Sequence, residues 1–325
     1  MSYQRFASVL AALSVLLCAS LPAAAAGWPD RPLHLIVPFG AGSTPDIVAR
    51  LVSDKLQQRI GEPVVVINKP GAGGNLGTQL VAEAAPDGYT LGLTISGPLA
   101  ANTLLFKNLP YDPQRDLDYL TIAATQPSIL VVSAKSGITD MPSLLAKLRS
   151  NPGKYNFSSM GVGSISHLAM EALAASSGTE IVHVPYASSA QAVTALLSGQ
   201  TQMAILPAAM VMAQIHAGTL KALAVATAKR FAVMPEVPTL SEAGLKNVQG
   251  DAWMGFVMPA KTPAAITQRL TKEIVAIVNS PDIKKKLQAQ YMEPVGDTPA
   301  EFRAIVRGDL ERWAPIIKKN HITLD

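Results

Sequence analysis

Two short stretches combine glycine with hydroxyl side chains at the start of a helical pattern. They read GAGSTPD, residues 40–46, and GVGSISH, residues 161–167. Each follows an apolar run and precedes apolar residues that recur at helical spacing. Both stretches therefore predict a strand, a glycine turn and the beginning of a helix. The residues that suit the N-caps of these helices are Ser43 or Thr44 in the first and Ser164 or Ser166 in the second.

A helix N-terminus preceded by glycines can bind an anion. The first N–H groups of a helix have no partner within it, and the helix dipole is positive at that end. Glycines turn the chain sharply and leave the backbone uncovered, so that a carboxylate or a phosphate can approach it. An ordinary chain reversal needs the same glycines, and from the first stretch alone this alternative stands equally well.

The two stretches together make a stronger case than either one alone. If they lie in opposite lobes, their helix N-termini can bind one anion from two sides. A charge-assisted hydrogen bond contributes about 1.5–3 kcal/mol, whereas micromolar affinity needs roughly 8 kcal/mol. Four or five such bonds, less the cost of closing the lobes, are sufficient without any arginine. The chemistry indicated is therefore the binding of a small anion.

Several catalytic and cofactor motifs are missing from the sequence. The glycine-rich stretch GAGGNLG has Leu76 where a dinucleotide fingerprint requires its third glycine. No phosphate-binding loop with lysine, no G-x-S-x-G and no metal-ligand spacing occurs. Ser164, Ser166 and His167 are neighbours in sequence, but at a helix start they point in different directions, which argues against a nucleophile and its base. We therefore expect no cofactor, no metal and no catalytic residue.

The N-terminus has the composition of an export signal. Residues 1–26 carry Arg5 as their only charge, and an apolar segment is followed by small residues that allow cleavage after Ala25 or Ala26. The single cysteine, Cys18, lies in this segment, so the mature chain has no disulfide or thiol chemistry. Removal of Arg5 from the 27 basic residues leaves 26 against 23 acidic ones, without a dense basic run. We therefore expect a soluble exported protein that does not bind nucleic acid.

Short β-rich runs alternate with helical patterns, which predicts α/β lobes built on parallel sheets with crossover helices. No flexible linker separates the lobes, so we expect extended strands to join them, at residues 120–128 and 224–230. These crossings divide the chain into a first lobe of residues 27–124 and 229–325 and a second lobe of residues 125–228. Ligands of such folds bind at the carboxyl ends of the strands. The predicted strands are 33–39, 64–68, 90–95, 120–125, 129–134, 155–159, 181–185, 203–206 and 220–227.

Several collinear motifs are typical of one family. They include HLIVPFGAGSTPDIVARLV, NKPGAGGNLGTQLVAEAAPDGYTL, LPYDPQRDLDYL and SSMGVGSISHLAMEAL, and they run through essentially the whole mature chain. In these motifs the chain resembles the Bug family, the periplasmic solute receptors of tripartite tricarboxylate transporters. The resemblance implies a two-lobed periplasmic binding protein of the Venus flytrap, type II-like class that closes on a small carboxylated solute. It also implies a monomer that delivers this solute to the membrane permease subunits of a tripartite transporter.

The resemblance also implies where the ligand binds, between the loop after the first strand and a helix start in the second lobe. Asp46 has a second interpretation, because an acidic residue in the first turn stabilises a helix end. Asn75 and Ser96 stand beside neighbouring strand ends, with a turn cap and a surface hydroxyl as the alternatives. Tyr186 and Trp253 are cleft walls or core residues. The loop residues carried over are Phe39, Gly42, Ser43, Thr44 and Asp46 on one side and Gly163, Ser164, Ser166 and His167 on the other.

The chain departs from the family at positions that bear on the ligand. Gln202 and Leu206 replace two aspartates that many relatives have, and Lys261 replaces a glycine. If residue 206 faces the cleft, the missing carboxylate disfavours a ligand with an ammonium group. We therefore expect a carboxylate with a neutral or apolar distal end, or with a second acid group, in preference to an amino acid. The alternatives are a sensor for a signalling partner and a periplasmic hydrolase or lyase on the same scaffold.

Overall fold

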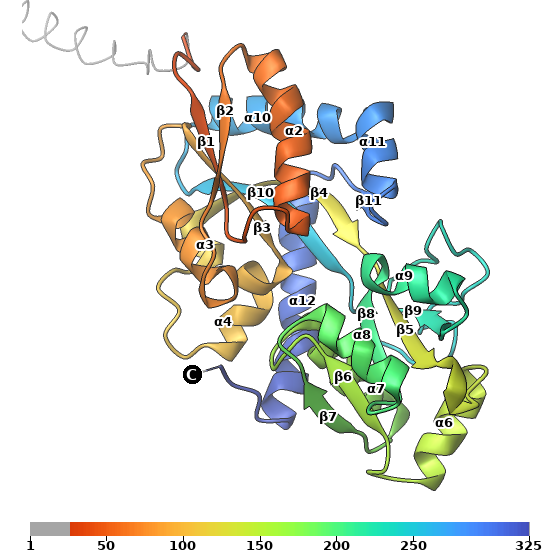
Figure 1. The fold of residues 1–325 in the computed structure, drawn as a ribbon. Coiled ribbons are helices and arrows are strands. Elements are labelled where there is room, and N and C mark those ends of the chain that lie inside the picture. The colour runs from red at the N-terminus through yellow and green to blue at the C-terminus, as the bar shows by residue number, and fades with distance from the viewer. Residues whose placement is uncertain (1–26, 325) are drawn as a thin grey trace, which may run out of the picture.

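The computed structural model describes residues 27–324, and Figure 1 shows them as two α/β lobes. A six-stranded sheet forms the first lobe and a five-stranded sheet forms the second. The predicted signal peptide, residues 1–26, lies outside the described residues. In the part that is described, no helix combines the length and the apolar character that a membrane span requires. The predicted two-lobed α/β class is confirmed.

The sheet of the first lobe contains both parallel and antiparallel strands. Its strands, in sheet order, are β11 (Glu293–Pro294), β4 (Leu117–Gln126), β10 (Ala252–Pro259), β3 (Thr90–Ile95), β1 (Leu33–Val37) and β2 (Val64–Asn68). β1 pairs parallel with β2 and β3, as predicted, whereas β10 runs antiparallel to both β3 and β4. The expectation of wholly parallel sheets is therefore wrong, because β10 enters the sheet from the second lobe without a crossover helix.

Alternate residues of β1 point to opposite faces of this sheet and contact different helices. Leu35 belongs to the buried cluster to which α2 (Thr44–Ile60), α10 (Ala264–Val278) and α11 (Pro281–Gln288) contribute. Ile36 belongs to the cluster on the other face, with Val81 of α3 (Asn75–Ala82) and Phe302 of α12 (Pro299–Lys319). The carboxyl end of β1 and the N-terminus of α2 lie on the side of this lobe that faces the second lobe (Figure 1). Short helical turns complete the lobe: η2 (Ala72–Gly74), η3 (Gly97–Ala101), α4 (Asn102–Leu105) and α5 (Pro113–Asp116).

The second lobe repeats this plan on a smaller sheet. Its strands, in sheet order, are β7 (Val182–Pro185), β6 (Asn156–Ser159), β8 (Met203–Pro207), β5 (Ser128–Ser133) and β9 (Leu220–Val225). β6 is parallel to β7 and β8, whereas β5 is antiparallel to β8 and β9. α8 (Ser189–Ser198) and α9 (Ala208–His216) bury apolar residues on one face. The turn η4 (Ala134–Ser136) leads to α6 (Met141–Ser150), which packs with α7 (Ile165–Ser177) in the cluster on the other face.

The two crossings between the lobes differ in how well the sequence located them. β4 ends at Gln126 in the first sheet and β5 begins at Ser128 in the second, inside the predicted segment 120–128. The second crossing, predicted at 224–230, lies instead near Gly250, whose N–H donates to the carbonyl of Ala226 at 2.8 Å just before β10 begins.

Residues 229–250, expected in the first lobe, pack on the second lobe. Their apolar side chains supply the surface that holds them there, because they enter the two buried clusters on its sheet. These residues are Phe231, Met234 and Val237 in one cluster and Leu240, Leu245 and Val248 in the other.

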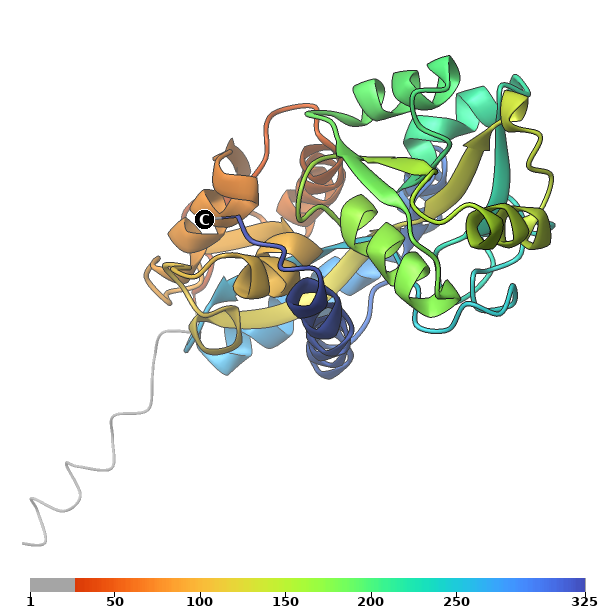
Figure 2. The same cartoon turned by 90° about the horizontal axis from the view of Figure 1, so that it is seen from below.

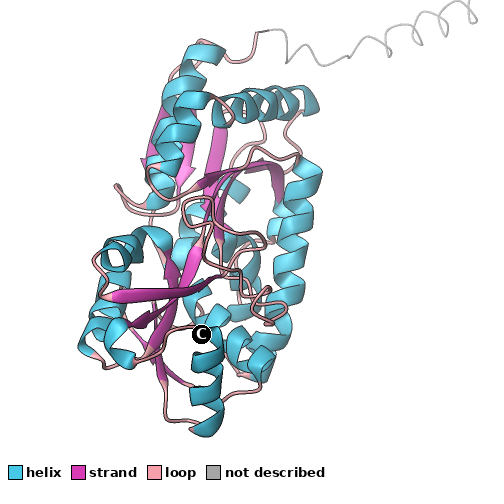
Figure 3. Cartoon of the chain, turned by 90° about the vertical axis from the view of Figure 1, so that its right-hand side faces the viewer, coloured by secondary structure: helices cyan, strands magenta, loops and turns pink. Residues whose placement is uncertain are grey.

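The C-terminal helix α12 connects the lobes a third time. Phe302 and Val306 near its beginning belong to the core of the first lobe. Trp313 and Ile317 near its end belong to the core of the second lobe. A helix of 21 residues is about 30 Å long, which is enough to reach both cores. Figure 1 shows this helix running from the first lobe to the second, and Figures 2 and 3 show the two lobes from below and from the side. The predicted assignment of the whole C-terminal segment to the first lobe is therefore incomplete.

Candidate functional site

The loop after β1 turns into α2 through a glycine with a positive φ. Gly42 has φ 78°, and its N–H donates to Oδ2 of Asp46 at 2.8 Å. The N–H of Ser43 donates to the carbonyl of Gly40 at 3.1 Å, and Ser43 is the N-cap of α2, as predicted. The side chain of Ser43 makes no capping bond. The shape of the loop therefore depends on the carboxylate of Asp46.

Asp46 is buried and is held by three hydrogen-bond donors. Oδ2 accepts from Gly42 and from Nε of Arg50 at 3.0 Å, and Oδ1 accepts from Nδ2 of Asn68 at 2.9 Å. Burial alone would raise the pKa of Asp46, but the hydrogen bonds of Arg50, Gly42 and Asn68 outweigh it and hold this pKa below its usual value. This geometry favours the alternative interpretation of Asp46, a residue that stabilises the loop and the helix end.

The loop after β6 has the same construction. Gly163 has φ 74°, and its N–H donates to Nδ1 of His167 at 3.1 Å. The N–H of Ser164 donates to the carbonyl of Gly161 at 3.3 Å, and Ser164 is the N-cap of α7. In both loops a positive-φ glycine precedes a serine N-cap, and the side chain four residues after that glycine accepts its N–H. The equivalent residues are thus Gly42 and Gly163, Ser43 and Ser164, and Asp46 and His167.

The backbone N–H groups that remain for a ligand follow each serine. Within residues 27–324, the N–H groups of Thr44 and Asp46 make no hydrogen bond, and neither do those of Ile165 and Ser166. These four groups lie in the first turns of α2 and α7, at the positive ends of the two helix dipoles. The N–H groups of both glycines, by contrast, are bonded within their own loops. The two glycines therefore give the loops their shape, and their own N–H groups are not available to a ligand.

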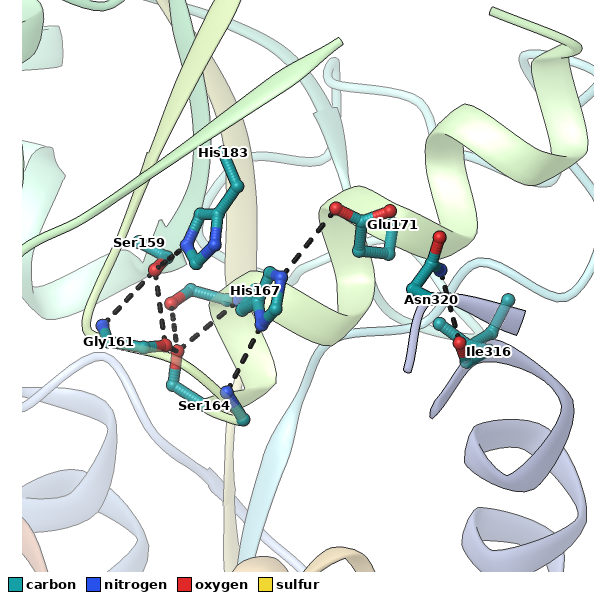
Figure 4. Close-up of polar contacts among 10 residues, drawn as sticks. Ser159, Gly161, Ser164, His167, Glu171, His183, Ile316 and Asn320 are labelled. Carbon is teal, nitrogen blue, oxygen red and sulfur yellow. Dashed lines mark hydrogen bonds and ion pairs between the residues drawn. The ribbon is translucent and has the colours of Figure 1, made fainter. Parts of the chain in front are cut away.

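The hydroxyls of the second loop are hydrogen-bonded to one another and to the backbone (Figure 4). Oγ of Ser164 donates to the carbonyl of Gly161 at 2.6 Å and lies 2.9 Å from Oγ of Ser166. Oγ of Ser166 also accepts from the N–H of Met160 at 2.9 Å. With the bond to His167 Nδ1, these contacts fix the loop, so direct side-chain contact with a ligand stays a prediction for Ser164, Ser166 and His167.

Two hydroxyls of the first lobe differ from those of the second loop. Within residues 27–324, Oγ of Ser43 and Oγ of Ser96 are buried without a hydrogen-bond partner. A buried polar atom without a partner costs about 1–3 kcal/mol. Ser43 is the N-cap of α2, and Ser96 directly follows β3. The surface hydroxyl interpretation of Ser96 is therefore wrong, because this side chain is only 1% exposed.

Two other predicted residues, Phe39 and Asn75, lie close to the first loop. Phe39 lies against Gly74, where an added Cβ would come within 2.9 Å of its ring. Oδ1 of Asn75 accepts from Nδ2 of Asn102 at 2.6 Å and from the hydroxyl of Tyr111 at 3.2 Å. Asn75 begins α3 and is buried, so it is a fixed polar group beside the loop; whether it contacts a ligand remains a prediction.

Three further residues considered from the sequence lie in the core of a lobe, as Trp253 and Leu206 do, or beside the second loop, where the carbonyl oxygen of Tyr186 is 3.7 Å from a Cβ added at Gly161. Trp253 is buried in the first lobe, where its Nε1 donates to Asp309 at 2.8 Å, so it is a core residue. Tyr186 lines a cavity of about 450 Å³ with residues of α8. Leu206 is fully buried in the second lobe. Its replacement of an aspartate therefore gives no information on the charge of a ligand.

The residues that the sequence analysis missed are the partners of these loops. Arg50 and Asn68 fix Asp46, and His183 stacks on His167 with 3.7 Å between the ring centroids. Asn68 is the last residue of β2, and His183 lies on β7. Neither residue is close in sequence to the glycine motif beside which it packs, so no local spacing connects them. In the described part of the chain, no group of three or more His, Cys, Asp or Glu side chains is arranged to hold a metal ion.

Replacing Asp46 with asparagine is expected to lower the free energy of unfolding at pH 7 by about 1–3 kcal/mol, because the charge-assisted bonds are lost. Since the folded pKa of Asp46 is lowered, its contribution is complete above the unfolded value of about 3.9 and is lost as the pH falls through the folded pKa. Urea unfolding of wild type and Asp46→Asn at pH 7 and pH 3 should show the difference shrinking at pH 3. Asp54→Asn, an exposed change on the same helix, is the control, and a difference that does not depend on pH would contradict this role.

Sequence comparisons give the family of this chain. Residues 48–322 match the model of the tripartite tricarboxylate transporter family receptor. A protein of Pseudomonas sp. strain P51, from the tcbD-tcbE intergenic region, is 37% identical over 291 residues, covering 89% of this chain and 86% of the relative. Protein BugT of Bordetella pertussis is 33% identical over 299 residues, with 92% of each chain covered.

Solved structures agree with the sequence comparisons. An R. palustris protein with adipate has a TM-score of 0.78 at 31% identity, covering 91% of this chain and 99% of that one. MatC from Rhodopseudomonas palustris, with bound malate, has a TM-score of 0.73 at 28% identity, covering 89% of this chain and all of that one. With matches over nearly its whole length, the chain belongs to the tripartite tricarboxylate transporter receptor family, the periplasmic solute-binding proteins that include the Bug proteins.

Proposed function

We propose that this protein binds a small carboxylate between the loop before α2 and the loop before α7, and delivers it to the membrane subunits of a tripartite transporter. The observation that carries the proposal is the repeated construction of the two loops, in which a serine N-cap follows a positive-φ glycine. Among residues 27–324, the four N–H groups that follow these serines have no hydrogen-bond partner. Delivery to a transporter, and the periplasmic location after export, are supported by the family.

The charge of the two loops favours an anion. Each helix N-terminus carries a partial positive charge, and the carboxylate nearest to the first loop, Asp46, is neutralised by Arg50 and accepts hydrogen bonds with both of its oxygens. Four N–H donors to a charged acceptor contribute about 1.5–3 kcal/mol each before the cost of closing the lobes. This sum is consistent with micromolar binding.

The distal end of the ligand is proposed to be a second acid group or a neutral chain. Asp46 is a poor partner for an ammonium group, because it is already paired with Arg50 and accepts hydrogen bonds from Gly42 and Asn68. The unpartnered hydroxyls of Ser43 and Ser96 can donate hydrogen bonds to carboxylate oxygens. Two structural neighbours hold dicarboxylates, adipate in one and malate in the other.

Calorimetry on protein stripped of ligand by unfolding and refolding tests this function. Adipate, succinate and malate are expected to bind with micromolar or lower dissociation constants, and aspartate and glutamate at least tenfold more weakly. The α-ammonium group of an amino acid must lose its hydrating water on binding without gaining a carboxylate partner. This costs more than about 1.4 kcal/mol, which corresponds to a tenfold loss of affinity. Tighter binding of the amino acids than of their deaminated analogues would contradict the proposed ligand class. Turnover of a bound carboxylate would contradict the receptor and favour a hydrolase or lyase.

A further inference from the structure

Two histidines of the second lobe are stacked beside the loop that precedes α7. The rings of His167 on α7 and His183 on β7 have centroids 3.7 Å apart and planes 10° apart. The ring of Phe157 on β6 is stacked on His183 at 4.9 Å. His167 is 5% exposed, and Phe157 is fully buried. The imidazole of His167 is thus held in one orientation by aromatic contacts from two strands, and Figure 4 shows His183 beside it.

The hydrogen bonds of His167 determine which of its nitrogens carries the proton. Nδ1 accepts the N–H of Gly163 at 3.1 Å, so this nitrogen is unprotonated. Nε2 lies 3.6 Å from Oε1 of Glu171, one turn later on the same helix. The arrangement requires the neutral imidazole with its proton on Nε2, directed toward Glu171.

The other glycine of the loop is connected to the second histidine. The N–H of Gly161 donates to Oγ of Ser159 at 3.1 Å, and this Oγ lies 2.6 Å from Nε2 of His183. Gly161 has φ 108° and Gly163 has φ 74°. Both positive-φ glycines are therefore bonded, directly or through one hydroxyl, to an imidazole of the stacked pair.

We propose that His167 is a positioning residue for the ligand, which in its neutral form holds Gly163 and thereby directs the first N–H groups of α7 toward the cleft. This inference rests on the proposed function and deepens it, since it assigns His167 a role that needs no contact with the ligand. A side chain without an acceptor at this place would leave the N–H of Gly163 without its bond. The loop then loses the contact that fixes its shape, and ligand binding is weakened.

The groups that surround His167 come from three elements. Glu171 lies one turn later on its own helix, His183 faces the ring from β7, and Phe157 is stacked with it from β6. Burial, together with the neighbouring His167, lowers the pKa of His183 to about 4, so His183 is neutral above pH 5. The side chains nearest to a Cβ added at Gly163 are those of Leu105 and Leu324, which are apolar.

The equivalent bond in the first lobe has a carboxylate acceptor. Gly42 donates its N–H to Asp46, whose pKa is held below its usual value. This carboxylate therefore keeps its charge between pH 5 and 8. The same loop construction thus uses an imidazole acceptor in the second lobe and a carboxylate acceptor in the first.

The test measures adipate affinity by calorimetry at pH 7.5. His167→Leu, with no acceptor for the N–H of Gly163, is expected to bind at least tenfold more weakly than wild type, the effect of one lost hydrogen bond to a buried donor. His167→Asn is expected to bind within about threefold of wild type, because its Oδ1 can accept from Gly163. His216→Asn, an exposed change on α9, should bind adipate as wild type does.

Two outcomes would overturn the inference. One is an adipate affinity of His167→Leu that equals that of wild type. The other is obtained without any ligand: in apo protein with ¹⁵N-labelled histidine, NMR at pH 7.5 should show His167 protonated at Nε2, and a proton on Nδ1 would exclude the bond to Gly163. If the tautomer is as expected but no carboxylate binds to wild type, the proposed function fails, and the positioning of a ligand by His167 fails with it.

Discussion

Replacing Gly255 with valine is expected to remove a large part of the protein's stability, about 3 kcal/mol or more. Gly255 lies in β10, between β3 and β4, where an added Cβ would approach the ring of Phe302 to 2.1 Å. Phe302 cannot yield, because it is fully buried and packs edge to face against Tyr119 and Trp253, with centroids 4.8 and 5.2 Å away. The extra methyl groups would push the beginning of α12 off the first sheet. Thermal unfolding should show a midpoint lower by roughly 6–12 °C.

The control for this change lies on the same helix. Gly308 is in α12, and an added Cβ there would meet nothing within 4 Å. Gly308→Ala is therefore expected to leave the midpoint unchanged or to raise it, since alanine is the better helix former by about 1 kcal/mol. Phe302→Leu should partly restore Gly255→Val, because it removes ring atoms from the contact. If Gly255→Val unfolds at the wild-type temperature, the packing of α12 against β10 is not as described.

Local patterns in the sequence located most of the elements of the fold. β2 and β3 have the predicted bounds, 64–68 and 90–95, because each is a short apolar run with turn signals on both sides. The antiparallel placement of β10 was not predictable in this way, because strand direction depends on where the chain re-enters the sheet. β11 has two residues, too few for any period. The second crossing was misplaced because residues 226–250 have no period and bury apolar side chains on the second lobe.

The candidate site was predictable in its backbone and less so in its side chains. Glycine, serine and helical periodicity follow one another along the chain, so both N-caps, Ser43 and Ser164, were found from sequence. The sequence interpretation was that the glycines bare the backbone for an anion, but their N–H groups are bonded to Asp46 and His167. These bonds depend on side-chain orientation, which Arg50 sets in one loop and His183 sets in the other. Contacts of this kind depend on how side chains are oriented in the folded protein, so no short sequence pattern predicts them.

Valine substitutions at the two ends of α2 test the alternative that the first glycine loop only reverses the chain. Gly42 precedes α2 with φ 78°, and Gly61 follows it with φ 85°. An added Cβ would meet nothing within 4 Å at either position. Valine at either site therefore introduces a similar backbone strain, about 1–2 kcal/mol, and the same side chain. The two variants differ in whether the strain falls on the proposed ligand loop.

Gly42→Val is expected to weaken adipate binding by about 10- to 100-fold, because a change of φ breaks the bond to Asp46 and moves the N–H groups of Thr44 and Asp46 by more than a hydrogen bond tolerates. Gly61→Val should bind adipate as wild type does, and both variants should melt within a few degrees of each other. Calorimetry and thermal unfolding on the pair separate the two explanations. Equal affinities would show that the loop before α2 only reverses the chain, and a loss in Gly42→Val alone would place the ligand at the N-terminus of α2.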